Sequence, residues 1–460
     1  MPDATATHLL VPTAIDAARV SAWAAIVSRA HAPAAPASAW IEAPQTGQRW
    51  ALTGWQSWTV PDGTQGVVSA RVVLTGLAAR TRLPIEFHAD GQVVAAATAS
   101  TLPDQLPGAG ERPFTVMLGS CFCAAEDKSG RLGRTFLSIP DGLRPDVTLL
   151  CGDQVYLDSP FYRFLLPHTT QGLAEAFLAN YDATWGQSSD RQGFQHVLSG
   201  GSNLFTSDDH EFWNNAPFPS FSVNTLLPAG RHDWWELAKG LYSAFQTPES
   251  PSVVRTFAIG DLSMLVADTR ITRSSDRTTF IDAADMARIV SWIGGLTAPG
   301  VLVVGQPLFE NVTGWSGNVA DWNLPDFEQY AALCRALLDA PQSILILTGD
   351  VHFGRVATAT THRGCELIEI ISSPMSLVTG GGTPAWHAPP ALFPAQAIPG
   401  SAQIAVTPVT TWQRAKNHFL TIELWQNGGR LNVRVRTWET NPDAGTPTAP
   451  VFEHLVQRSV

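Results

Sequence analysis

The chain has 460 residues, of which 45% are hydrophobic and 15% are charged, a composition typical of a globular protein. This length exceeds what one ordinary hydrophobic core accommodates, so we expect two domains. The formal charge of −11, from 29 basic and 40 acidic residues, argues against binding to a nucleic-acid backbone.

The first 112 residues predict a small antiparallel β-sandwich. Short runs rich in Val, Trp and Thr alternate with turns that contain Pro, Gly or Asp, which is the usual pattern of such a domain. A turn-rich stretch at 102–113 follows and is expected to be a linker. We therefore predict an N-terminal domain at 1–112 and a second domain at 113–460. The strand-like runs are 20–27, 49–58, 66–76 and 82–89.

Beyond residue 112, apolar strand-like runs alternate with helical patterns, which predicts an α/β fold with helices outside a central sheet. In such folds, ligands bind beyond the carboxyl ends of the strands. A Pro-rich loop at 384–399 is long enough to form a lid, although a surface loop without that role is an equal alternative. We expect strands at 114–118, 146–151, 203–207, 301–304, 343–347, 366–371, 419–425 and 430–438, a hairpin at 257–268, and helices at 172–185, 234–245, 283–296 and 326–338.

The sequence predicts neither export nor membrane insertion. The first ten residues lack the basic and apolar regions of a signal peptide, and no run of about 18 apolar residues could span a membrane. The expected location is the cytoplasm, or the periplasm or exterior if a leader is missing from this sequence. Five cysteines without paired spacing argue against a disulfide framework and a structural zinc site. The sequence leaves the oligomeric state open.

Asp153 and Tyr156 form the first candidate metal-binding motif. Asp153 follows the apolar run at 146–151, so its carboxylate is expected at the mouth of a buried strand. Tyr156 could add a phenolate, a hard ligand that suits ferric iron. Taken alone, Asp153 is more often a cap or turn residue, and Tyr156 a half-buried aromatic with a satisfied hydroxyl.

The run Asp208-Asp209-His210-Glu211 forms the second motif. It follows the strand-like run at 203–207, where two adjacent carboxylates repel each other unless a cation neutralises them. One aspartate could then bind a metal while His210 faces a substrate. The alternative is that Asp208 caps the next helix and His210 is packed in the core.

Asp350 and His352 form the third motif, after the buried run at 343–347. Because side chains alternate along a strand, we expect the two to point to the same side. A turn aspartate and a hydrogen-bonded histidine are the alternative. Cys121 follows the run at 114–118 and could be a thiolate ligand, although a lone buried cysteine is usually inert.

These motifs resemble those of the alkaline phosphatase D (PhoD-like) family of the calcineurin-like metallophosphoesterase superfamily, from roughly residue 113 to the C-terminus. The resemblance implies an α/β layered fold with a metallophosphoesterase-type central β-sandwich flanked by helices, preceded by a small all-β sandwich. It rests on Gly119-Ser120-Cys121, Gly152-Asp153-x-x-Tyr156, Asp208-Asp209-His210-Glu211, Ala267-Asp268-Thr269-Arg270, Gly305-Gln306 and Gly349-Asp350-x-His352.

The resemblance also implies two or more metal ions, namely ferric iron with calcium, or with manganese, magnesium or zinc as the divalent ion. Asp153 would bridge two metals, Tyr156 would complete an iron site, and Asp209 would replace the superfamily's metal-binding asparagine. The roles of Asp208 and of Gln306, which stands where another histidine is expected, stay open. The metal candidates are Cys121, Asp153, Tyr156, Asp208, Asp209, Asp350 and His352.

The implied activity is hydrolysis of a small-molecule phosphate ester at a two-metal centre that clamps the phosphate and activates water. His210 would protonate the leaving alkoxide or stabilise charge on the phosphoryl oxygens. Arg270 would bind phosphate through its forked guanidinium, and Asn214 would donate a hydrogen bond to the phosphate. An ion pair of Arg270 with Asp268 or Asp276 is an equal alternative, as is a capping role for Asn214.

Two other functions are compatible with these motifs. A phosphodiesterase or phospholipase D-type enzyme would use the same metals, and relative rates on monoester and diester substrates would separate it from a monoesterase. A catalytically degenerate binding protein is the second alternative, and it would hold less than stoichiometric metal.

Overall fold

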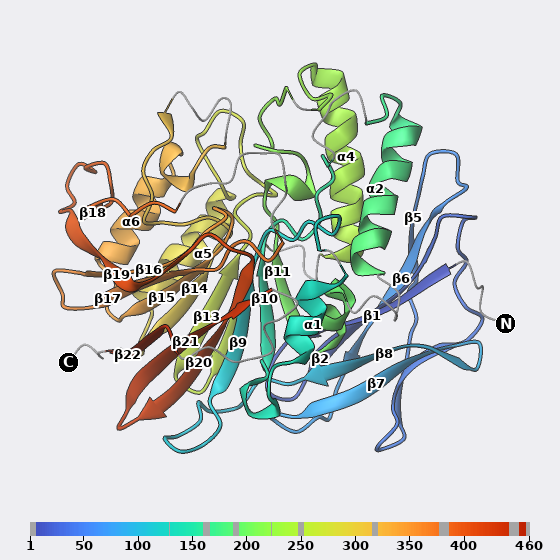
Figure 1. Cartoon of the computed structure of the whole chain (residues 1–460), viewed down its shortest axis with the longest axis horizontal. Coiled ribbons are helices and arrows are strands. Elements are labelled where there is room, and N and C mark those ends of the chain that lie inside the picture. Colours follow the sequence, from blue (N-terminus) through green and yellow to red (C-terminus); the bar gives the residue numbers. More distant parts are fainter. Residues whose placement is uncertain are drawn as a thin grey trace.

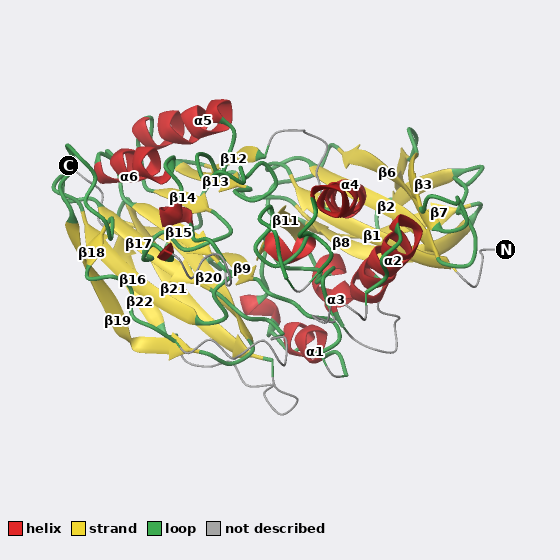
Figure 2. Ribbon diagram, turned by 90° about the horizontal axis from the view of Figure 1, so that it is seen from above, coloured by secondary structure: helices red, strands yellow, loops and turns green. Residues whose placement is uncertain are grey.

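The computed structural model describes residues 6–127, 129–159, 166–186, 193–221, 223–246, 253–314, 321–376, 386–440 and 450–456. Over these residues, the strands form two large sheets and one small sheet, with helices on the outer faces (Figure 1, Figure 2). This confirms the predicted layered α/β arrangement. No helix in this part of the chain is both long and apolar enough to cross a membrane.

The first large sheet contains the strands that precede the first two acidic motifs. β9, β10 and β11 run parallel near its centre, so their carboxyl ends lie side by side. Across the sheet the order is β22 (Phe452–Val456), β21 (Arg430–Glu439), β20 (His418–Asn427), β9 (Phe114–Gly119), β10 (Val147–Cys151), β11 (Ser202–Thr206), β1 (Ala6–Ala14), β2 (Val20–Ser28), β6 (Gly66–Leu74) and β5 (Gln56–Thr59).

The second large sheet contains the strand that precedes the third motif. β13, β14, β15 and β17 are parallel, and the other strands are antiparallel to their neighbours. The order is β12 (Val254–Ile259), β13 (Leu262–Ala267), β14 (Gly300–Val303), β15 (Ile344–Thr348), β17 (Glu366–Ile371), β16 (Gly354–Thr360), β19 (Ile404–Arg414) and β18 (Leu392–Phe393).

The N-terminal strands form a sandwich that is joined to the first large sheet. One layer is the small sheet of β4 (Gln48–Ala51), β3 (Ala39–Ala43), β7 (Arg82–Ala89) and β8 (Gln92–Ser100), and its apolar side chains pack against β1, β2 and β6. The other layer continues into β11 through the parallel pair Thr13–Asn203. The buried amide of Asn203 donates to the carbonyls of Pro12 (3.0 Å) and Leu198 (2.7 Å). The division at residue 112 stays a prediction.

Helices cover the outer faces of the two large sheets (Figure 2). Apolar side chains between the two large sheets form one core. A further core lies between each sheet and the helices on its outer face. The helices over the first sheet are α1 (Arg131–Leu137), α2 (Thr170–Trp185), α3 (Phe194–Ser199) and α4 (Pro228–Phe245), and those over the second are α5 (Ala283–Gly294) and α6 (Tyr330–Leu338).

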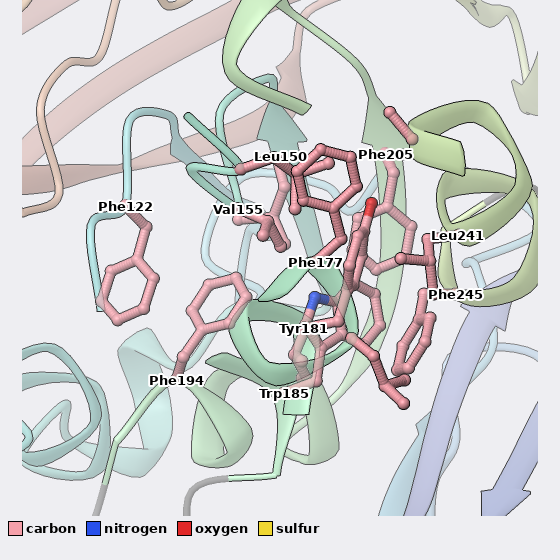
Figure 3. Packing of buried hydrophobic residues seen from close by; sticks show 14 of the residues in the cluster. Phe122, Leu150, Val155, Phe177, Tyr181, Trp185, Phe194, Phe205, Leu241 and Phe245 are labelled. Carbon is pink, nitrogen blue, oxygen red and sulfur yellow. The ribbon is translucent and has the colours of Figure 1, made fainter. Parts of the chain in front are cut away.

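An aromatic cluster beneath α2 and α4 fixes the ends of the motif strands (Figure 3). Tyr181 and Trp185 are one helical turn apart on α2, and both contact Phe245 of α4. Trp185 also contacts Phe205 of β11, while Phe122, just beyond β9, stacks on a ring of α3. Burying each such side chain contributes about 1.5–3 kcal/mol. The cluster therefore holds the loops after β9 and β11 against the helices.

The Pro-rich loop at 384–399 lies partly beside the third motif. The ring of His387 packs edge-on against Phe353, next to His352, with ring centroids 4.7 Å apart. Further along, β18 pairs with β19 at the edge of the second sheet. Residues 384 and 385 fall outside the described residues, and the role of the loop as a lid stays a prediction.

Candidate metal centre

The candidate ligands lie in loops at the carboxyl ends of strands from both large sheets. Cys121 follows β9, Asp153 follows β10 and Asp209 follows β11. Asp350 and His352 follow β15 of the other sheet. The strand ends thus bring together side chains that are far apart in the sequence, as the fold class predicts.

Among the described residues, three groups of side chains have ligand atoms within 4.8 Å of one another, and the groups share members. Asp153 belongs to the first two groups and Asp209 to the last two, so they form one continuous row, called the ligand row below. Shared carboxylates are what neighbouring cations require when a ligand bridges them. The groups are Cys121, Asp153 and His352; Asp153, Asp209 and His210; and Asp209, Asp321 and Asp350.

Four members of the ligand row have left-handed backbone conformations. Their φ angles are 56° at Cys121, 57° at Asp153, 70° at Asp350 and 57° at His352. Such conformations are uncommon for residues other than glycine and cost of order 1–3 kcal/mol each. They persist only where the surrounding structure fixes them, and here each one turns a potential ligand into the row.

The expectation that Asp350 and His352 alternate along a strand is wrong. β15 ends at Thr348, and both residues lie in the turn that follows. The two side chains therefore serve different ends of the ligand row. His352 lies with Cys121, whereas Asp350 lies with Asp321.

The carboxylate of Glu211 joins the loops after β10 and β11. Its Oε2 accepts hydrogen bonds from the backbone N–H groups of Asp153 and Asp208, both at 2.8 Å, and its Oε1 accepts from Gln154 at 2.6 Å. The side chain is fully buried. The loops also touch at Gly152, where a Cβ atom would lie 2.4 Å from Cβ of Asp208. Glycine before Asp153 is thus required by the close approach.

Asp153, which is buried, and Asp350, which is half-buried, are carboxylates whose hydrogen-bond donors are neutral. Asp153 accepts from the thiol of Cys121 (3.4 Å) and the backbone N–H of His210 (3.1 Å), and Asp350 accepts from the amide of Gln306 (3.0 Å). Burial, together with neighbouring carboxylates, raises the pKa of both groups well above its usual range. Cations at the row would remove this penalty, so the donor set fits metal ions.

Asp209 has a similar environment at the centre of the row. Its Oδ2 accepts from the backbone N–H of Asn215, and the side-chain amide of Asn214 lies 3.4 Å away. Burial raises its pKa as well, with His210 opposing the shift. Asn214 is therefore placed next to the ligand row, and its contact with phosphate stays a prediction.

His210 is held by Asp158, a residue that the sequence analysis missed. Nδ1 of His210 lies 2.8 Å from Oδ1 of Asp158, and both side chains are buried. Burial alone would lower the pKa of His210, but Asp158 and Asp209 outweigh it and hold that pKa well above its usual range. The two carboxylates therefore favour the protonated form of the imidazole. The spacing of Asp158 five residues after Asp153 was the available signal, but it lies in a turn.

Tyr156 lies between His210 and His352. Its ring stacks on His210 with centroids 4.2 Å apart, and its hydroxyl oxygen is 3.5 Å from Nε2 of His352. Burial lowers the pKa of His352 to about 4, so its imidazole is neutral, the form that binds metals. The phenol of Tyr156 is therefore next to the group that contains Cys121 and His352.

Arg270 holds two carboxylates in place rather than facing open space. Its guanidinium pairs with Asp208 and with Asp321 (2.9 Å), and donates to the carbonyl of Ala216 (2.8 Å). Only its backbone N–H bonds Asp268. The side chain is 1% exposed, so the expected contact of Arg270 with phosphate is replaced by these ion pairs. Asp208 joins none of the three groups, and the sequence analysis missed Asp321.

Gln306 orients two acids of the row instead of offering a ligand oxygen. Its amide nitrogen donates to Asp321 (2.6 Å) and Asp350 (3.0 Å), and its amide oxygen accepts from Arg273 (2.9 Å). With the oxygen engaged by arginine, the contribution of Gln306 is to position the carboxylates.

No family model matches the chain, and no curated protein matches it in sequence. The structure is similar to that of PhoD, with a TM-score of 0.65 and 14% identity over 100% of this chain and 94% of PhoD. It is also similar to purple acid phosphatase PPD1 from yellow lupin (Lupinus luteus) seeds, with a TM-score of 0.58 and 12% identity over 97% of this chain and 74% of that one. At these identities the likeness concerns the fold, and it confirms the predicted metallophosphoesterase-type fold class.

We expect Glu211→Gln to destabilise the protein, although this substitution replaces no member of the ligand row. The amide would turn an N–H₂ group toward backbone N–H donors, so buried donors lose their acceptor at a cost of about 2–4 kcal/mol. Urea unfolding measures this loss, and elemental analysis should show less bound metal. Glu236→Gln, at an exposed position of α4, is the matched control. Equal stability of the two variants would contradict the bridging role of Glu211.

Proposed function

We propose that the chain hydrolyses phosphate esters at a centre of two or more metal ions. The observation that carries this proposal is the ligand row, in which Asp153 and Asp209 are each shared between two groups of potential ligands. The likeness of fold to PhoD and to a purple acid phosphatase, which is a phosphatase by name, supports the same activity.

The chemistry of the donors suggests which ion each end of the row would hold. A thiolate, a neutral imidazole and a phenolate suit ferric iron, whereas an all-carboxylate group suits a hard divalent ion, calcium first and manganese, magnesium or zinc as alternatives. When bound, such ions withdraw charge from phosphoryl oxygens and make water a better nucleophile. The iron end would comprise Cys121, Asp153, Tyr156 and His352, and the divalent end Asp209, Asp321 and Asp350, with Asp153 as the bridge.

The residues around the row have separate tasks in this proposal. The pKa of His210 is raised by Asp158, which its Nδ1 faces, so Nε2 is the nitrogen that would give a proton to the leaving alkoxide. Asn214 can donate a hydrogen bond to a phosphoryl oxygen from its place beside Asp209. Arg270 acts through Asp208 and Asp321, whose positions it fixes.

The ligand assignment is tested by Asp153→Asn and Asp350→Asn. Purified protein with analysed metal content is assayed on p-nitrophenyl phosphate and bis-p-nitrophenyl phosphate, whose relative rates separate monoesterase from diesterase activity. Each substitution should reduce kcat/KM at least about 100-fold, or about 2.7 kcal/mol, because an ion loses a charged ligand. Asp104→Asn, at an exposed position, should have no effect. Full activity in both ligand variants would refute the proposal.

The acid role of His210 predicts a dependence on the leaving group. In Asp158→Asn, the imidazole loses the charge that keeps it protonated, so hydrolysis of an alkyl phosphate should slow by about 10²–10⁴. p-Nitrophenolate leaves without a proton, so the rate on p-nitrophenyl phosphate should fall less than about tenfold. His362→Gln, at an exposed histidine, is the control. An equal fall on both substrates would mean that His210 is not the acid.

The iron assignment predicts a coloured protein. Charge transfer from the Tyr156 phenolate to ferric iron should give a visible absorption band, because phenolate is a strongly donating ligand. Tyr156→Phe should abolish this band. Tyr330→Phe, which removes a buried hydroxyl bonded to the carbonyl of Leu308, should retain it. Iron-loaded wild-type protein without a visible band would exclude a tyrosinate ligand.

A further inference from the structure

A separate pocket lies outside the ligand row, between α4 and the segment that follows β13. It is an open pocket of about 570 Å³, within the range of sites for small molecules. None of its lining residues belongs to the three ligand groups. Its floor includes Trp213, and its two walls come from α4 and from residues 271–282.

The α4 wall presents a cation, an aromatic ring and a second cation. Arg231, Trp235 and Lys239 are spaced four residues apart, so they share one helix face, and all three line the pocket. The rise of an α-helix places Arg231 and Lys239 about 12 Å apart along the axis. One small anion cannot reach both cations closely, whereas an elongated ligand can.

The N-terminal end of this wall combines one cation, Arg231, with the first turns of α4. Pro228, Arg231 and His232 line the pocket, and they belong to the first turns of an 18-residue helix. The first turn of α4 contains no acidic residue and no side chain caps it, so its N–H groups and the helix dipole favour an anion. In a chain of formal charge −11, this local excess of positive charge is a specific feature.

The opposite wall adds polar groups that also favour an anion. The hydroxyl of Thr272 is buried and has no hydrogen-bond partner among the described residues. Arg273 contributes positive charge, although its donors are engaged by Gln306 and by the carbonyls of Thr269 and Trp322. Among the lining residues, Asp282 is the one acidic side chain.

Trp235 is held as a rigid platform. Its ring stacks on Phe212 with centroids 4.5 Å apart and an interplanar angle of 21°, and it meets Trp213 edge-on at 5.9 Å. The side chain is only partly buried by these contacts. A fixed indole between two cations is suited to stacking against a planar group.

We propose that this pocket is a metal-independent binding site for an organic phosphate that contains a planar ring. The phosphate meets Arg231 and His232 at the N-terminal end of α4, and the ring stacks on Trp235. Lys239 offers a second cation one turn further along. A nucleoside monophosphate has this chemistry. The proposal does not depend on hydrolysis at the ligand row.

Calorimetric titration of the chelator-treated full chain with AMP, adenosine and inorganic phosphate tests the site. AMP should bind one molecule per chain, at least about tenfold more tightly than adenosine or phosphate, since only AMP engages both Arg231 and Trp235. Inorganic phosphate that binds as tightly as AMP would refute the aromatic platform. Absence of AMP binding at millimolar concentration would refute the site.

Variants locate the binding. Arg231→Gln alters a side chain at the surface of the pocket and should weaken the binding of AMP at least about tenfold. Arg335→Gln removes the same charge from an exposed position of α6 and should leave AMP binding unchanged. Asp153→Asn should also bind AMP normally. Weakening in Arg335→Gln would show non-specific attraction, and weakening in Asp153→Asn would place AMP at the ligand row; either result overturns the proposal.

Discussion

The structure around the ligand row depends on how the negative charges of closely spaced carboxylates are compensated. Arg270 pairs with both Asp208 and Asp321, and His210 pairs with Asp158. Asp153 and Asp350 meet neutral donors instead, and burial raises the pKa of both. Leaving two such charges unpaired costs several kcal/mol per ion. The site must therefore either take up protons or bind cations, and its soft and hard donors suit cations.

Because the carboxylates of the row repel one another, the backbone that carries them must be held firmly by other contacts. Left-handed residues such as Cys121 and Asp153 would relax if their loops were loose, and their side chains would leave the row. The carboxylate of Glu211 joins the loops after β10 and β11 by hydrogen bonds. The aromatic cluster of α2 and α4 packs against the strands that precede these loops (Figure 3). Apolar packing thus maintains an arrangement that the charges alone would disperse.

The sequence predicted the parts of this site that depend on local pattern. A buried strand followed by glycine and an acid placed Asp153 and Asp350 at strand ends, because parallel strands bring their carboxyl ends together. Asp158 lies in a turn and Asp321 lies outside the helices and strands, so only tertiary contacts bring them to the row. The orientation of the Arg270 side chain also depends on a tertiary contact, its ion pair with Asp208 from the loop after β11. For the same reason the sequence did not predict that β1 would extend the first sheet beside β11.

Helix α4 connects the ligand row to the outer surface. Its inner face packs in the aromatic cluster, the indole of Trp234 donates to the carbonyl of Phe212 (2.6 Å), and Tyr242 donates to Asp268 (2.7 Å). Its outer face carries the cations of the pocket. Phe212 directly follows the loop of His210, and Trp235 stacks on it. A ligand on Trp235 would therefore contact a ring that stacks on Phe212, and Phe212 continues the backbone of the loop that carries His210. The pocket and His210 thus share one packed element.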